Sequence, residues 1–117
     1  MLRQASVFLL MLVGAGVLIG CGSTPAGPDN DLVIIMITGL DGDQAFDPAV
    51  ATVKVGQSVA WKNNDTATHR PILTNVFDTK QLPGGATSAA TKMTTPNTYE
   101  YKCTIHPSET GTIVVTP

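Results

Sequence analysis

Three side chains with the chemistry of metal ligands stand near the ends of predicted strands. Cys103 and His106 are three residues apart in Cys103-Thr-Ile-His106, directly after a predicted strand. A tight loop at this spacing can aim a thiolate and an imidazole at one point. The only other histidine of the sequence is His69, which lies in the loop after Trp61. A thiolate with two imidazoles is the ligand set of a mononuclear copper electron-transfer site.

The second cysteine, Cys21, closes a segment that is typical of export. Residues 5–19 carry no charge, and this mostly apolar run ends in Leu18-Ile19-Gly20-Cys21. Its length suits a signal peptide and is short for a membrane span, which needs roughly 20 apolar residues. The ending resembles the bacterial lipobox, which implies cleavage before Cys21 and lipidation of that residue. The alternatives are a plain signal peptide, or an anchor helix with an incidental cysteine.

The predicted export signal affects how Cys103 is interpreted. Cysteines of exported proteins normally pair. If Cys21 carries lipid, Cys103 has no partner in this chain, which leaves an intermolecular bridge, a reactive thiol or a metal ligand. Taken singly, a buried free cysteine is more often a small core residue than a ligand, and a lone histidine is more often a surface or hydrogen-bonded residue. The neighbouring His106 favours the metal ligand.

Length and charge set outer limits on fold and function. The chain has 117 residues, a formal net charge of −2 and 14% charged residues. This length favours one domain. The missing cationic excess excludes a strongly basic nucleic-acid binder. We expect a signal peptide at 1–20, a Gly- and Pro-rich tether at 21–31 that begins with lipidated Cys21, and a folded domain at 32–117.

The folded part is expected to be all-β. Thr, Val and Ile are frequent, and Gly, Pro, Asn and Asp interrupt them at short intervals, which favours a sandwich or barrel. Strands are predicted at 32–38, 50–55, 58–62, 71–73, 86–94, 98–103 and 112–116. Residues 39–48 are predicted as a loop, and 76–80 are ambiguous.

A series of short motifs resembles the small cupredoxins of the plastocyanin, amicyanin and pseudoazurin type. In chain order they are Phe46-Asp-Pro48, Val53-Lys-Val-Gly56, Val59-Ala-Trp-Lys-Asn63, Asp65, His69, Tyr99-Glu-Tyr-Lys-Cys103, His106-Pro107 and Gly111-Thr-Ile-Val-Val115. The resemblance covers 46–117 and implies an antiparallel Greek-key β-sandwich of about seven to eight strands. It also implies one blue-copper ion under three loops, with His69, Cys103 and His106 as ligands.

The chain departs from this family at the weak axial ligand, which is usually a methionine three residues after the second histidine. Glu109 occupies that position, and the four methionines are Met1, Met11, Met36 and Met93. Glu109 could bind the metal as the axial ligand. It could instead point to solvent and leave three ligands, with the carbonyl of Thr68 or a water in addition. Copper binding could also be lost or altered.

Support around the ligands is expected from the loop before His69. Asn64 or Asp65 is the candidate to hydrogen-bond near the thiolate or to brace the loops. Ile105, Pro107, Pro71, Leu82 and Pro83 would form an apolar surface around His106, the expected exit for the electron.

The function expected from the resemblance is electron transfer by an exported copper protein that is lipid-anchored to a membrane facing the periplasm or the cell exterior. Its partner would be a redox protein such as a cytochrome or an oxidoreductase, and the protein itself a monomer. The alternatives are a copper-delivery lipoprotein without a redox partner and a metal-free interaction domain with the same fold. An enzyme is not expected, because the sequence offers neither a second copper set nor a Ser/His/Asp arrangement.

Overall fold

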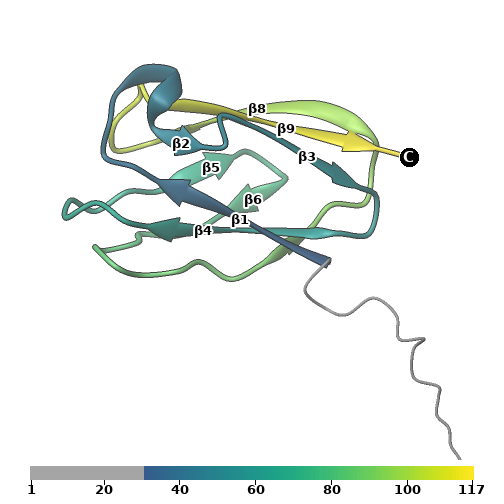
Figure 1. Cartoon of the computed structure of the whole chain (residues 1–117), viewed down its shortest axis with the longest axis horizontal. Coiled ribbons are helices and arrows are strands. Elements are labelled where there is room, and N and C mark those ends of the chain that lie inside the picture. The colour runs from purple at the N-terminus through teal and green to yellow at the C-terminus, as the bar shows by residue number, and fades with distance from the viewer. Residues whose placement is uncertain (1–30) are drawn as a thin grey trace, which may run out of the picture.

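The structure is a computed structural model that describes residues 31–117. Within this range the chain forms nine strands and one short 3-10 turn, η3, at Gly42–Gln44 (Figure 1). The strands are β1 (Leu32–Ile37), β2 (Phe46–Asp47), β3 (Val50–Lys54), β4 (Ser58–Asn63), β5 (Pro71–Leu73), β6 (Phe77–Asp78), β7 (Thr91–Lys92), β8 (Asn97–Cys103) and β9 (Thr110–Thr116). No helix within residues 31–117 has the length and apolar character needed to cross a membrane. The predicted signal peptide and most of the predicted tether lie outside the described residues.

The strands form two packed sheets, which confirms the all-β sandwich. One sheet has the order β2-β1-β4-β7, and the other has the order β3-β9-β8-β5-β6. The antiparallel arrangement that the resemblance implies holds for the other strand pairs but not for two of them, because β1 pairs with β4 and β3 pairs with β9 in parallel. Parallel neighbours need a crossover connection. Here the chain leaves the first sheet after β2, forms β3 in the second sheet, and returns to place β4 beside β1.

The prediction of one continuous strand at 86–94 is also wrong, since only Thr91–Lys92 is a strand there. This segment lies beside β4, but its hydrogen bonds with β4 do not form a regular ladder. The Ser88 hydroxyl accepts a hydrogen bond from the backbone N–H of Trp61, while the Ser88 N–H donates to the Trp61 carbonyl. The Ser88 hydroxyl therefore takes the place of a backbone carbonyl as the acceptor for the Trp61 N–H. The predicted loop at 39–48 contains η3 and β2, and the ambiguous segment 76–80 contains β6.

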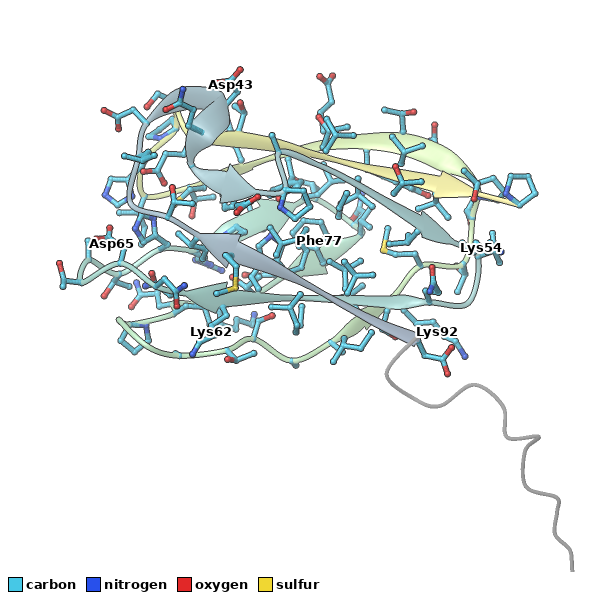
Figure 2. All side chains as sticks on the ribbon, in the orientation of Figure 1. Asp43, Lys54, Lys62, Asp65, Phe77 and Lys92 are labelled. Carbon is cyan, nitrogen blue, oxygen red and sulfur yellow. The ribbon has the colours of Figure 1, made fainter. Side chains whose placement is uncertain are left out.

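Aromatic rings fill the space between the sheets. Phe77 lies between the two layers (Figure 2), and its ring centroid is 4.4 Å from that of Trp61. Tyr101 packs against Phe46 at 4.9 Å and against Trp61 at 5.4 Å, the latter edge to face. Such tilted pairs are favourable beyond the area they bury. The core therefore ties β2, β4, β6 and β8 together.

Gly111 makes room for one of these rings. It lies opposite Tyr101 in the pairing of β8 with β9. A Cβ atom on Gly111 would be 2.5 Å from both Cζ and the hydroxyl oxygen of Tyr101. That hydroxyl accepts a hydrogen bond of 3.2 Å from the Trp61 indole N–H. The position therefore requires glycine for space.

The connections β4–β5 and β8–β9 lie at the same end of the sandwich (Figure 1). The first described strand starts at the opposite end, where the C-terminus also lies. All four candidate metal-binding residues belong to the end with these two connections.

Replacing Gly111 by alanine should destabilise the domain by about 1–3 kcal/mol, as is typical when a packed core receives an extra methyl group. The added Cβ must displace Tyr101 and disturb its hydrogen bond with Trp61. Urea unfolding of Gly111→Ala measures this loss. Thr110→Ala is the matched control, because Thr110 is exposed on the same strand and its loss should cost less than about 0.5 kcal/mol. Equal midpoints for the two variants would contradict the packing role of Gly111.

Candidate metal centre

Four potential ligands meet at the end of the sandwich. Cys103 is the last residue of β8, His106 and Glu109 lie in the connection to β9, and His69 comes from the connection between β4 and β5. One ligand atom from each side chain lies within 4.8 Å of all the others. Cys103, His69 and Glu109 are buried, with 0%, 1% and 3% exposure. The His106 side chain is 37% exposed, which agrees with its predicted place near the surface.

The donor atoms face one another. Cys103 Sγ lies 3.6 Å from His106 Nδ1 and 3.9 Å from His69 Nδ1. Glu109 Oε1 lies 3.0 Å from His69 Nδ1 and 3.5 Å from His106 Nδ1. The structure therefore brings together all four residues predicted from the sequence. It also excludes the alternative in which Glu109 points to solvent.

A short hairpin connection positions three of these side chains. The Cys103 N–H donates to the Glu109 carbonyl at 3.0 Å, and the Glu109 N–H donates to the His106 carbonyl at 2.9 Å. These two bonds close the connection on itself directly beyond the β8–β9 ladder. The spacing of Cys103 and His106 thus has the effect expected from the sequence, and the same turn directs Glu109 inward.

The backbone of His69 is held by hydrogen bonds to a distant segment. Its N–H donates to the Leu82 carbonyl at 3.1 Å, and its carbonyl accepts from the Leu82 N–H at 2.8 Å. Asn63, fully buried at the end of β4, donates from Nδ2 to the carbonyls of Ala67 and Leu82 and accepts from the Asp65 N–H. The loop that carries His69 is therefore closed around one buried amide.

Of the two candidates named from the sequence, Asn64 does not brace this loop through its side chain, whereas Asp65 contacts His69. The Asn64 side chain is exposed, and its N–H donates to the Ile37 carbonyl. The preceding residue, Asn63, has the bracing role because the alternation of β4 turns it toward the core. That alternation, with Val59 and Trp61 on the same face, was the sequence signal that could have identified it.

Arg70 is a supporting residue that sequence reasoning missed. Its backbone N–H donates to Cys103 Sγ at 3.3 Å, and its carbonyl accepts from the Thr104 N–H at 3.0 Å. Its guanidinium group forms a bidentate pair with Asp78, at 2.9 Å and 2.6 Å. Arg70 therefore fixes the sulfur through its backbone, while its side chain anchors it to β6. Its place directly after His69 is the only sequence signal.

The outer nitrogen of His69 meets a second carboxylate. Asp65 Oδ2 lies 2.8 Å from His69 Nε2. The hydrogen bond from His69 lowers the pKa of the Asp65 carboxyl below its usual value, with a further contribution from the Thr66 N–H. An ionised carboxylate only accepts hydrogen bonds, so the ring proton belongs on Nε2. Asp65 is thus a neighbour of the imidazole and not of the thiolate.

This proton assignment tests whether a metal ion fits the centre. With Nε2 directed at Asp65, Nδ1 of His69 faces Glu109 Oε1, 3.0 Å away, and is the ring nitrogen available to a metal ion. The Cys103 sulfur and His106 Nδ1 point lone pairs into the same space. Donor atoms that face one another at these distances need either a shared proton or a metal ion between them, and a metal ion can be bound by all four at once. A thiolate and two imidazoles suit copper, and the added carboxylate oxygen also suits Zn²⁺. The residues therefore fit a metal ion.

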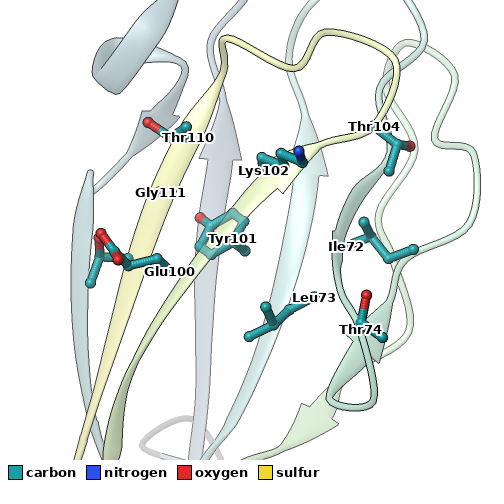
Figure 3. Close-up of a pocket in the computed structure, with 10 residues that line it drawn as sticks. Ile72, Leu73, Thr74, Glu100, Tyr101, Lys102, Thr104, Thr110 and Gly111 are labelled. Carbon is teal, nitrogen blue, oxygen red and sulfur yellow. The ribbon is translucent and has the colours of Figure 1, made fainter.

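A separate groove lies on the outer face of the second sheet (Figure 3). It has a volume of about 530 Å³ and is lined by residues of β5, β8 and β9, among them Ile72, Tyr101 and Thr112. None of the four donor residues lines it. The groove is therefore distinct from the metal centre.

The apolar surface expected around His106 is smaller than predicted. Ile105 is 41% exposed and Pro107 is also exposed. Pro71 and Leu82 are buried, because Pro71 pairs with Cys103 in the sheet and Leu82 pairs with His69. These two residues support the centre from within.

Comparison with known proteins agrees with this fold and donor set. Residues 9–115 match the cupredoxin-like domain family. A plastocyanin from Scenedesmus fuscus is 32% identical over 91 residues, which cover 63% of this chain and 89% of the plastocyanin. The Cu(I) form of an amicyanin variant is 25% identical, with a TM-score of 0.61 over 73% of this chain and 82% of the amicyanin. A purple cupredoxin from Nitrosopumilus maritimus is 25% identical, with a TM-score of 0.59 over 71% of this chain and 98% of that protein.

The chain therefore belongs to the cupredoxin-like domain family. The predicted cupredoxin fold is confirmed. The prediction of copper as cofactor is also confirmed, because the family and the donor set agree on it.

The ion pair that anchors Arg70 predicts a pH dependence of stability. Hydrogen bonds from Arg70 and from the Lys80 N–H hold the pKa of the Asp78 carboxyl well below its usual value. Its folded-state pKa is thus lower than the unfolded value of about 3.9. The stabilisation is therefore present above that value and is lost as the pH falls toward the folded pKa.

Asp78→Asn should accordingly be less stable than the wild type at about pH 7, and the difference should shrink at about pH 3. Urea midpoints of the metal-free proteins at both pH values measure this. Asp43→Asn, which removes an exposed acid from η3, is the control and should differ little from the wild type. An Asp78→Asn deficit that is the same at both pH values would contradict the role of the ion pair.

Proposed function

We propose that this protein is an exported, membrane-anchored electron carrier that binds one copper ion through His69, Cys103, His106 and Glu109. The observation that carries the proposal is the convergence of one sulfur, two Nδ1 atoms and one carboxylate oxygen within 4.8 Å. Membership of the cupredoxin-like family supports the copper-binding part. The relatives named plastocyanin and amicyanin support electron transfer.

The framework of the centre suits rapid electron transfer. Copper, when bound, supplies the Cu(I)/Cu(II) couple. Three of the four side chains are buried, and backbone hydrogen bonds to Leu82, Glu109 and Arg70 hold their positions. Ligands held in place by the protein need little movement when the charge of the ion changes. His106, with its side chain 37% exposed, offers a route for the electron to a docked partner.

Glu109 should make this centre unlike an ordinary blue-copper site. Its carboxylate is buried and lies on the side of both Nδ1 atoms. A hard anionic oxygen stabilises Cu(II) relative to Cu(I), so the reduction potential should be low. With copper bound, this carboxylate would add a fourth donor to the thiolate and the two imidazoles, and the colour should shift from blue toward green or red. The same four donors should bind Zn²⁺ well.

The membrane anchor is proposed from the lipobox-like sequence at Leu18–Cys21. The geometry of the described residues is compatible with it, because β1 starts at the end of the sandwich opposite the metal centre (Figure 1). A tether at that end would leave His106 free to meet a redox protein such as a cytochrome or an oxidoreductase. The proposed role is that of a monomeric carrier and not of an enzyme.

Copper delivery is the second candidate function. The observation in its favour is the partial exposure of His106, which gives an acceptor access to one ligand. A delivery protein should pass copper to an acceptor without a change in oxidation state, whereas an electron carrier should retain the ion in both states.

Optical and EPR spectra of the copper-loaded protein test the proposal. We expect an intense thiolate-to-Cu(II) charge-transfer band in the wild type. Cys103→Ala should lose this band completely, whatever Glu109 does, because the sulfur is its source. An absent band in the wild type after copper loading, or a band that survives in Cys103→Ala, would contradict the proposed copper site.

Glu109→Met tests the axial ligand. Replacing the carboxylate by a thioether should give an ordinary blue spectrum and a higher reduction potential, because the anionic oxygen that favours Cu(II) is gone. Glu109→Gln is the matched variant, since it keeps the size and one oxygen but removes the charge, and it should give an intermediate potential. Voltammetry and optical spectra measure both. Unchanged spectrum and potential in Glu109→Met would mean that the carboxylate is not a ligand.

A further inference from the structure

The imidazole of His69 lies between two carboxylates, one on each ring nitrogen. Glu109 Oε1 is 3.0 Å from Nδ1, on the side of the metal centre, and Asp65 Oδ2 is 2.8 Å from Nε2, on the far side. Asp65 lies at the same end of the sandwich as the connections that form the centre (Figure 2). Its place in the loop before His69 therefore turns a charged group toward the back of a metal ligand.

The Asp65 carboxylate is held in this orientation from two further directions. Its Oδ1 accepts the Thr66 N–H at 2.7 Å. On another side the turn after β1 packs closely against it, since a Cβ atom on Gly39 would be 2.8 Å from Asp65 Cγ. The Asp65 side chain keeps only 25% exposure. Oδ2 is consequently directed at His69.

The shape of the loop before His69 depends on Asn63 and not on Asp65. The buried Asn63 amide ties the loop to Leu82 and to Ala67. Apart from His69, the polar contacts of the Asp65 carboxylate are to N–H groups of its own loop, at Thr66 and Ala67. The contact with His69 is therefore the one that links the Asp65 carboxylate to the metal centre.

We infer that Asp65 is a positioning residue that makes the centre selective for divalent ions. The inference rests on the proposed metal-binding function of His69. By accepting the Nε2–H, Asp65 keeps the His69 ring turned with Nδ1 toward the ion and makes that nitrogen a stronger donor. A ligand histidine supported in this way by a carboxylate typically loses about 10–100-fold in metal affinity when the support is removed.

The negative charge of the centre determines which ions Asp65 should favour. The Cys103 thiolate and the Glu109 carboxylate contribute two negative charges next to the ion, and Asp65 adds a third behind His69. Negative charge close to an ion stabilises a divalent state more than a monovalent one. Asp65 should therefore strengthen the binding of Zn²⁺ and Cu(II) more than the binding of Cu(I), and should lower the reduction potential.

Zn²⁺ binding by the full-length protein, measured by competition with a chelator, is the main test. Zn²⁺ is redox-inactive, so the result does not depend on electron transfer. Asp65→Asn keeps the size and an acceptor oxygen but removes the charge, and we expect about a tenfold weaker affinity; Asp65→Ala removes both and should approach a 100-fold loss. Asp43→Asn is the control for an exposed charge and should change the affinity less than about twofold.

Two further readouts separate positioning from a general loss of structure. In NMR spectra of the Zn²⁺-loaded protein, the His69 Nε2 proton should exchange slowly with solvent in the wild type and much faster in Asp65→Ala. The reduction potential of the copper form should rise from the wild type through Asp65→Asn to Asp65→Ala. Thermal unfolding of the metal-free variants identifies any folding defect, and Asp65→Asn retains the shape most closely.

The inference is overturned if both Asp65 variants bind Zn²⁺ as tightly as Asp43→Asn and the Nε2 proton of Asp65→Ala exchanges as slowly as in the wild type. This outcome differs from a failure of the proposed function. A wild-type protein without a copper charge-transfer band would contradict the copper site, whereas the zinc and proton measurements test Asp65 alone.

Discussion

Four electron-pair donors within 4.8 Å of one another form an arrangement that is unfavourable without a cation. The Cys103 sulfur, both Nδ1 atoms and Glu109 Oε1 need a shared proton or a metal ion between them, and three of the side chains are also removed from water. The surrounding backbone has to hold them in place. Hydrogen bonds from Leu82, Glu109 and Arg70 do so here.

The two sheets meet this constraint by fixing backbone positions. Pro71 and Cys103 are partners in the pairing of β5 with β8, which brings the loop of His69 beside the end of β8. Asn63 closes that loop from the core, and the Arg70 N–H reaches the sulfur. Each of these contacts joins segments that are distant in sequence, so the geometry of the centre depends on the whole sandwich and not on one loop.

Exposure and charge divide the centre into two sides. His106 borders solvent, while His69 is enclosed between the carboxylates of Glu109 and Asp65. The exposed side suits contact with a partner, and the enclosed side sets the charge that a bound ion experiences. The cupredoxin framework thus places a buried carboxylate beside the thiolate and the two imidazoles, and the proposed preference for a divalent ion rests on this more anionic environment.

The sequence by itself determined the features that depend on local spacing and alternation. Cys103, His106 and Glu109 lie close together in the sequence, and the continuous apolar run of β1 with the alternation in β4 and β8 favoured a sandwich or barrel. It did not determine the strand order, the parallel pairs or the break of the strand at 86–94, since these depend on partners far along the chain. Only the tertiary structure decided that Glu109 turns inward and that the Arg70 N–H reaches the sulfur. The physical reason is that every residue except proline has the same backbone N–H group, so the sequence around it does not indicate its partner. The partner is fixed only when the fold brings a distant acceptor within hydrogen-bonding distance.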